Sequence, residues 1–322
     1  MGLLRGHDKQ HQSLTMQELL MPATERQVAR DITYASAAKR RSGRAVIRII
    51  ENTTGRLRLI RKARGYDAEV AAGADFWKVM TARYGVSLAV VGGTLDNIPT
   101  DGPLIVVSNH PYGILDGLMM GRILSERRQG DFRVLAHRIF RRAADLERII
   151  LPISFDDTKE AATLNLETRR AAIAYLNSGG AIGIFPGGTV STSATPFSKP
   201  MDPSWRTFTA KMIAKSGATV VPVFFEGHNS RLFQLASHLH STLRTGMFIR
   251  EFKVRINKPV RVVVGEPIPA DMLAQFKKDP KGCMDFLRKA TYELSTSPMD
   301  PTHLGHEFEE KYKARNGSGH IR

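Results

Sequence analysis

The chain has 322 residues, of which 42% are hydrophobic, so it can bury a sizeable core and disorder throughout is excluded. Lys and Arg number 47 against 31 Asp and Glu, and the net charge of +16 favours an anionic partner such as nucleic acid, anionic lipid or an acidic carrier protein. The single cysteine, Cys283, excludes an intramolecular disulfide and a cysteine-based metal site, which fits a reducing cytosol. We expect neither a signal peptide nor a membrane-spanning helix, because no segment has the required apolar run.

The excess of positive charge is concentrated near the N-terminus. Twelve Lys or Arg lie between Arg26 and Arg64, against two acids. Residues 40–65 interleave basic and apolar residues in the pattern of a basic amphipathic helix that is interrupted near Gly55. Such a helix either adsorbs on an anionic membrane or packs on the core with a solvated basic face. A second helical pattern at residues 68–85 completes a basic helical N-terminal extension, residues 1–85.

From residue 86 onward, short apolar strands alternate with helical patterns. We expect strands at 87–92, 103–109, 132–137, 148–154, 181–186, 218–227 and 260–268, and helices at 116–128, 159–177, 205–215 and 230–240. Near-continuous apolar strands that alternate with helices indicate a sheet buried on both faces. The prediction is an α/β domain over residues 86–297, with a mixed, largely parallel sheet covered by helices on both faces. Residues 298–322 are expected to form a disordered tail.

The stretch VVSNHPYGILDG, residues 106–117, leads from a strand through a Pro/Gly turn into a helix. Functional groups collect at such carboxyl ends of strands in open α/β sheets. His110 could act as a general base near neutral pH, and Asp116 could fix its tautomer and stabilise the imidazolium. Alternatively, Asp116 is only a helix N-cap and His110 serves only the loop. No serine or cysteine nucleophile is apparent, which favours direct attack by a substrate hydroxyl.

Two further stretches could bind an anion. AIGIFPGGTVS, residues 181–191, runs from a strand into a turn where Gly187 and Gly188 let backbone N–H groups approach an anionic oxygen, although an ordinary turn has the same pattern. In VLAHRIFRR, Arg138 follows a strand and is the best candidate to hold a phosphate or a carboxylate. Otherwise Arg138, with Arg141 and Arg142, forms a solvated surface.

With these pieces in this order, the chain resembles the lysophospholipid acyltransferase family, which includes the bacterial 1-acyl-glycerol-3-phosphate acyltransferases. Within it, the chain looks closest to the hemolysin-labelled branch that is related to the O-acyltransferases of ornithine-lipid synthesis. Four family blocks match in order: NHPYGILDG, a block around Arg138, FPGGTVS, and VVPVFFEG at residues 220–227. They span residues 88–269, and the first and third blocks are the specific ones.

The resemblance implies a mechanism and a set of site residues. His110 would deprotonate an acceptor hydroxyl, which attacks the thioester of acyl-CoA or acyl-carrier protein, while Asp116 orients the histidine. Donors for the thioester carbonyl are expected near Gly187, Gly188 or the 109–113 turn. We expect no metal and no cofactor. The candidate substrate-binding residues are Asn109, Gly113, Arg138, Phe185, Pro186, Gly187, Gly188 and Thr189.

Two departures from the family pattern matter. Five residues separate His110 from Asp116 where four are usual, a longer turn that the resembled branch often has. The third block usually reads FPEGTRS, and Gly187 and Val190 replace its Glu and Arg. Because the family uses this block for glycerol phosphate, the two replacements favour a lysolipid with another headgroup.

We therefore expect an O-acyltransferase that acts on a lysolipid, such as a lyso-aminolipid, peripherally at the cytoplasmic face of a bacterial inner membrane. One alternative is a 1-acyl-glycerol-3-phosphate acyltransferase. Another is a non-catalytic basic membrane-binding protein, against which the presence of both His110 and Asp116 argues. A nucleic-acid partner is not expected, because only Tyr34 and Tyr66 lie in or beside the basic stretch for base stacking.

Overall fold

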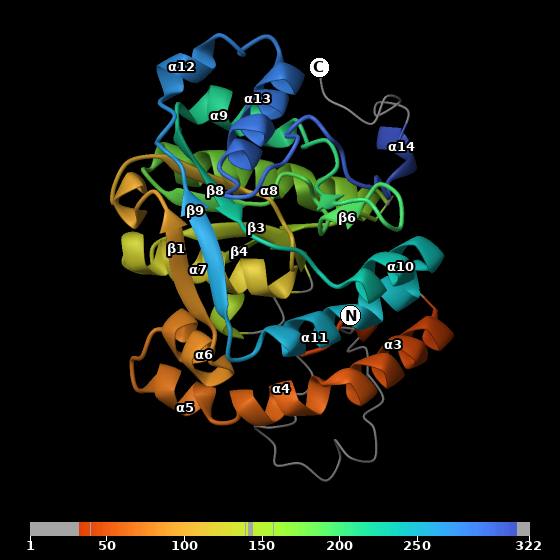
Figure 1. The fold of residues 1–322 in the computed structure, drawn as a ribbon. Helices are drawn as coiled ribbons and strands as arrows, with labels where there is room; N and C mark the ends of the chain where they lie inside the picture. The colour runs from red at the N-terminus through yellow and green to blue at the C-terminus, as the bar shows by residue number, and fades with distance from the viewer. Residues whose placement is uncertain (1–31, 39, 139, 141–143, 157, 314–322) are drawn as a thin grey trace, which may run out of the picture.

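A seven-stranded sheet forms the centre of the molecule (Figure 1). The structure is a computed structural model that describes residues 32–313 except 39, 139, 141–143 and 157. The strands lie in the order β1-β9-β8-β2-β5-β3-β4. Their bounds are β1 Ser87–Gly92, β2 Leu104–Ser108, β3 Arg133–His137, β4 Ile150–Ile153, β5 Ala181–Ile184, β8 Thr219–Phe225 and β9 Pro259–Val264. Each lies where the sequence predicted a strand. β6 (Thr192–Ser193) and β7 (Pro200–Met201) form a separate antiparallel pair.

The sheet is mixed and largely parallel, as predicted. β8, β2, β5, β3 and β4 run parallel to one another, and β9 is antiparallel to β8. β2 is buried along its whole length, which is typical of a strand that is covered on both faces. Because these five strands share one direction, their carboxyl ends meet at the same edge of the sheet.

Helices cover both faces, which confirms the predicted α/β fold. On one face, Val106 packs with α4 (Arg56–Ala63), α6 (Phe76–Tyr84) and α7 (Ile114–Arg127). On the other, Ile105 packs with α8 (Lys159–Asn177), α9 (Phe208–Ser216) and α13 (Pro280–Glu293), of which α9 and α13 lie at the top of Figure 1. Successive residues of β2 thus enter opposite cores, as the two-residue period of a strand requires.

Two long helices were not predicted from the sequence. α11 (Ser241–Arg255) follows α10 (Arg231–Leu239) directly, and its buried face includes Arg244 and Glu251, so it lacks a purely apolar stripe. α13 carries a readable start signal, because Asp279 accepts the Gly282 N–H and Pro280 lies in the first turn. Shorter helices among the described residues include α5 (Tyr66–Ala71), α12 (Ala270–Ala274), α14 (Glu310–Lys313) and the 3-10 turns Ala35–Ala37, Leu95–Asn97 and Ala144–Leu146.

The basic amphipathic stretch forms α3 (Arg41–Thr54) and α4, which are separated at Gly55 as the sequence predicted. α3 lies along α11 (Figure 1), where Ile50 approaches Gly246 so closely that a Cβ there would be 3.0 Å away. Of the two alternatives for this stretch, membrane adsorption and packing on the protein, the second therefore holds for one face of α3.

α3 also carries apolar side chains in solvent. Val46 and Ile49 are 41% and 62% exposed. None of the helices among the described residues is both long and apolar enough to span a bilayer. Arg26 and Arg30, the first basic residues of the stretch, lie outside the described residues.

The prediction of a disordered C-terminal tail needs correction for residues 298–313. Leu304 is buried, and Glu307 accepts two hydrogen bonds from the Arg206 guanidinium, at 2.7 and 2.9 Å. The polar composition gave no sign of this segment's order, because ion pairs of Glu307 and Glu309 with Arg206 and hydrogen bonds from Arg288 help to hold it on the domain. Residues 314–322 lie outside the described residues.

Candidate active site

His110 and Asp116 face each other across the turn between β2 and α7. Asp116 is the third residue of the helix, and Gly113 caps it. Asp116 Oδ2 accepts the N–H groups of Tyr112 and Gly113, at 2.7 and 2.9 Å, and lies 2.9 Å from His110 Nδ1. Asp116 is therefore not the N-cap itself, as the capping interpretation had expected, but the third helical residue, and one of its oxygen atoms contacts both the start of the helix and the imidazole.

Gly113 makes this turn possible. Its φ is +90°, a conformation that side-chain-bearing residues rarely adopt. A Cβ at this position would also lie 3.3 Å from Val190 Cγ2 and 3.4 Å from Phe248 Cδ1. We therefore assign Gly113 to the backbone geometry of the site, where the sequence analysis had grouped it with the substrate-binding residues.

The Asp116 carboxylate is fully buried. Burial raises its pKa, although the His110 contact and the two backbone N–H bonds oppose the shift. Its Oδ1 has no hydrogen-bond partner among the described residues, and the short Nδ1–Oδ2 contact is not aligned as a hydrogen bond. A poorly solvated anion of this kind is stabilised when the neighbouring imidazole gains a proton.

The other ring nitrogen of His110 remains available to a substrate. The side chain is 18% exposed, and no hydrogen bond joins Nε2 to any residue that the structure describes. The Phe185 ring stacks on the imidazole, with centroids 4.2 Å apart and planes at 23°. Asp116 on Nδ1 and Phe185 on the ring face together aim Nε2 outward.

The second predicted motif lies beside this histidine as a tight turn. We call residues 185–192 the glycine loop. The Gly188 N–H donates to the Phe185 carbonyl at 3.1 Å, and the Pro186 carbonyl accepts the Arg206 N–H at 2.9 Å. The N–H groups of Gly187 and Thr189 have no acceptor within the described part of the chain. These two donors can therefore receive an oxyanion.

In the 109–113 turn, by contrast, every backbone N–H group that follows Asn109 already has an acceptor. The His110 N–H donates to Asp202 at 3.2 Å, Pro111 has no N–H, and the next two N–H groups bind Asp116. This corrects the expectation that the turn could polarise a thioester carbonyl.

Asn109 joins two strands. Its Nδ2 donates to the Phe225 carbonyl at 2.9 Å, and its Oδ1 accepts the Phe225 N–H at 2.7 Å. Both ends of the buried amide are thus used to fix the carboxyl end of β2 against that of β8. The side chain thereby holds the fourth sequence block against the first.

Arg138 lies at the same sheet edge but at some distance from His110. β5 separates β3 from β2, and neighbouring strands are about 4.8 Å apart, so the end of β3 is about 10 Å from the end of β2. The Arg138 guanidinium is exposed and pairs with Asp156 at 2.9 Å. Arg141 and Arg142 lie outside the described residues.

The sequence analysis missed Asp202, a fully buried carboxylate that contacts both His110 and Ser191. Asp202 stands alone between short segments in a stretch without periodicity. No local pattern marks such a residue, since only tertiary packing brings it to the histidine.

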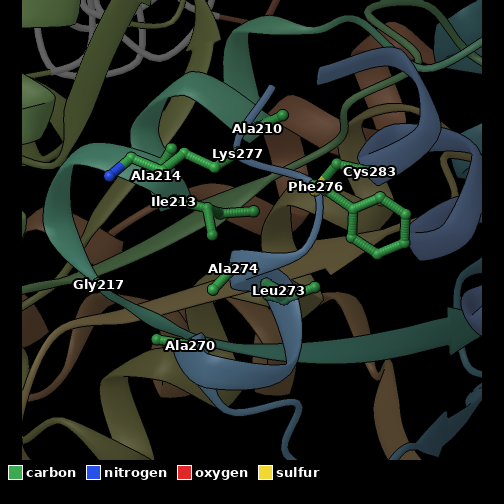
Figure 2. A pocket seen from close by; sticks show the side chains of 10 residues that line it. All are labelled: Ala210, Ile213, Ala214, Gly217, Ala270, Leu273, Ala274, Phe276, Lys277 and Cys283. Atoms are coloured by element: carbon green, nitrogen blue, oxygen red, sulfur yellow. The ribbon is translucent and has the colours of Figure 1, made fainter. Parts of the chain in front are cut away.

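A hollow of about 160 Å³ lies elsewhere, between α9, α12 and α13 (Figure 2). Its walls include Ile213, Leu273, Phe276 and Cys283, and none of its residues belongs to the four sequence motifs. Burial raises the pKa of the Cys283 thiol to about 11, so that this cysteine is not a ready nucleophile. Among the described residues, no group of three His, Cys, Asp or Glu side chains is arranged to hold a metal ion.

Comparison with known proteins places the chain in a family. A family model described as Acyltransferase matches residues 69–300, which is more than half of the chain. The protein therefore belongs to this acyltransferase family and is an acyltransferase, as the motifs predicted.

Two curated relatives are each 26% identical to the chain. Both are lyso-glycine lipid O-acyltransferases. The protein from Phocaeicola vulgatus aligns over 71% of this chain and 80% of its own length, and the one from Bacteroides thetaiotaomicron over 69% and 80%. The solved structure of the 1-acyl-sn-glycerophosphate (LPA) acyltransferase PlsC from Thermotoga maritima aligns with a TM-score of 0.42 and 17% identity, over 83% of this chain and 87% of that one.

Asp116→Asn separates orientation of the histidine from helix capping. The Asn carbonyl oxygen can accept the same two N–H bonds, and its amide replaces Oδ1, which has no partner among the described atoms. We expect turnover to fall by about 10²- to 10⁴-fold, because the imidazolium loses its carboxylate.

The stability of this variant has a defined pH dependence. Because burial raises the Asp116 pKa, the wild type loses this residue's stabilisation as the pH rises from about 4 through the raised value. The variant lacks that loss, so its Tm relative to wild type should increase between pH 4 and pH 8. Normal turnover together with a large fall in Tm at pH 8 would assign Asp116 to capping alone.

Proposed function

We propose that the protein transfers a fatty acyl group from an acyl thioester to the hydroxyl of a lysolipid with an amino-acid headgroup. The observation that carries this proposal is the His110–Asp116 pair, with Nε2 open beside the unused N–H groups of the glycine loop. The two relatives named lyso-glycine lipid O-acyltransferases support the class of acceptor.

The chemistry needs one base and one oxyanion site. His110 Nε2 takes the proton from the acceptor hydroxyl as its oxygen attacks the thioester carbon. The imidazolium lies against the Asp116 carboxylate. The carbon–sulfur bond then breaks, the new ester keeps the acyl group, and the proton passes from His110 to the departing thiolate.

The glycine loop supplies the second part of the site. The carbonyl oxygen becomes an anion in the tetrahedral intermediate, and the N–H groups of Gly187 and Thr189, which have no acceptor among the described residues, are its donors in this proposal. Phe185 holds the imidazole on the same side as the loop. Base and donors thus come from the ends of adjacent parallel strands, β2 and β5.

The headgroup preference follows from the side chains of the glycine loop itself, none of which is charged. Gly187 and Val190 offer no charged contact to a phosphate. Arg138 forms an exposed ion pair with Asp156, and such pairs are worth about 0–1 kcal/mol. A lipid carboxylate can therefore take the place of Asp156 at this guanidinium.

Acceptor selectivity tests the proposal. Lyso-glycine lipid, lyso-ornithine lipid and lysophosphatidate are assayed side by side with acyl-CoA and, in parallel, acyl-carrier protein, and release of free thiol is measured. One charge-assisted contact is worth about 1.5–3 kcal/mol, so the missing loop arginine should lower kcat/KM for lysophosphatidate about ten- to a hundredfold relative to the amino-acid lipids. Higher kcat/KM with lysophosphatidate would identify the protein as a 1-acyl-glycerol-3-phosphate acyltransferase instead.

We further propose that the protein works at an anionic membrane surface and reaches it through α3. Exposed Val46 and Ile49 offer apolar contact, and Arg40 and Arg41 at the start of α3 and Arg58 on α4 are exposed as well. Basic residues near an anionic surface contribute about 1 kcal/mol each. A cytoplasmic, peripheral location fits this arrangement.

Vesicle binding tests the membrane proposal. Replacing Arg40, Arg41, Arg58 and Arg61 by Gln should weaken sedimentation with anionic vesicles, and raising the salt should do the same, because the Debye length falls from about 10 Å at 0.1 M to about 3 Å at 1 M. The matched control replaces four exposed lysines on the opposite side of the sheet by Gln, namely Lys277, Lys278, Lys281 and Lys289. Equal binding of both variants, or equal binding of the wild type to neutral vesicles, contradicts an anchor on α3.

A further inference from the structure

Arg244 is a buried arginine without a carboxylate partner in the part of the chain that the structure describes. It is 6% exposed and comes from α11, which belongs to none of the sequence motifs. Nη1 donates to Thr192 Oγ1 and Ser237 Oγ, at 2.6 and 3.0 Å, and Nη2 donates to Thr189 Oγ1 and the Val190 carbonyl, at 3.1 and 2.9 Å. Three of these four acceptors belong to the glycine loop.

Burying this cation is unfavourable, because it loses water and gains no counter-ion. The neutral oxygens and the nearby rings offset this only in part: the Phe308 and Phe233 centroids lie 4.3 and 5.0 Å from its Cζ. Burial lowers the pKa of Arg244 to about 9, which leaves the group charged at neutral pH. Unfavourable arrangements of this kind cluster at functional sites, where they fix geometry.

A buried carboxylate holds the same loop from the other side. Asp202 Oδ1 accepts the His110 N–H and the Ser191 hydroxyl, and its Oδ2 accepts the Trp205 Nε1–H at 2.9 Å. The Ser191 N–H donates in turn to the His110 carbonyl at 2.8 Å. A Cβ on Gly187 would lie 3.2 Å from the Asp202 carboxyl group, so that carboxylate occupies the space of a side chain at position 187.

We propose that Arg244 and Asp202 are positioning residues for acyl transfer, which together hold the glycine loop at a fixed distance from the His110 imidazole. The loop itself has no charged side chain, and both charges reach it from other parts of the chain, α11 and the residue after β7. Neither group touches the reacting atoms. The inference rests on the proposed role of His110 as the base.

Two substitutions of Arg244 test its role. Arg244→Gln removes the charge, and Arg244→Lys keeps it but cannot bridge the separate acceptors of the loop. Each should lower kcat about ten- to a hundredfold per folded molecule, with less than a threefold change in KM for thioester or lysolipid, because the error in distance matters most in the transition state. Arg250→Gln, on the same helix and paired with Glu251, is the matched control and should keep the wild-type kcat.

A double-mutant cycle between Arg244 and Thr189 distinguishes a positioning role from a general loss of stability. Thr189→Val removes a loop acceptor while leaving Arg244 in place, and it should lower kcat on its own but have little further effect in the Arg244→Gln background. Asp202→Asn should show the same split between kcat and KM. Folding of each variant is checked by circular dichroism and gel filtration.

The inference is overturned if folded Arg244→Lys, Thr189→Val and Asp202→Asn all keep kcat within about twofold of the wild type, well short of the roughly hundredfold loss that a 1 Å misplacement can cause. An equal loss in the Arg250→Gln control overturns it too. A wild type that consumes no thioester with any lysolipid refutes the proposed function itself, which is a different result from an active wild type with indifferent variants.

Discussion

One buried oxygen atom, Asp116 Oδ2, holds together the two halves of the turn between β2 and α7. It accepts two backbone N–H groups and contacts the imidazole, so the start of α7 and the orientation of His110 depend on the same charge. A hydrogen bond to a charged group contributes about 1.5–3 kcal/mol, which offsets part of the unfavourable burial of the carboxylate. The protein thereby keeps a buried carboxylate at a place where protonation of the neighbouring imidazole would stabilise its negative charge.

The parallel sheet gives this turn its neighbours. Because β2, β5 and β8 share a direction, the histidine turn, the glycine loop and the Phe225 backbone end at one edge. Asn109 ties β2 to β8, and Asp202 ties the histidine backbone to the glycine loop. The site is therefore built on rigid strand ends, with buried polar groups setting the distances between them.

Local patterns in the sequence predicted much of this arrangement. Apolar runs marked the seven strands, and the pairing of His110 with Asp116 could be predicted because six positions and a glycine turn connect them. The Gly55 break in the basic helix was predictable for the same reason. Such features depend on neighbours in the chain, where spacing is informative.

Features set by distant contacts could not be predicted in this way. Asp202 and Arg244 reach the glycine loop only through tertiary packing. α11 lacks the usual amphipathic pattern of a helix, because charged residues lie on its buried face. Asn109 precedes His110 in the sequence and was therefore expected to bind the substrate. Instead, the oxygen and the nitrogen of its amide both bind the Phe225 backbone, 116 residues further along the chain. The C-terminal segment likewise depends on Arg206, about 100 residues earlier, for its ion pair with Glu307.

The proposed acyl transfer requires His110 to act as the base, and chemical rescue tests this role most directly. His110→Ala opens a space beside the Phe185 ring that free imidazole can enter. We expect the folded variant to lose about 10²- to 10⁴-fold in turnover, measured as thiol release with an acyl thioester and a lysolipid, and added imidazole to restore part of it in a dose-dependent way. Turnover within about threefold of the wild type, without added imidazole, would contradict the account, since general-base catalysis is worth far more than that.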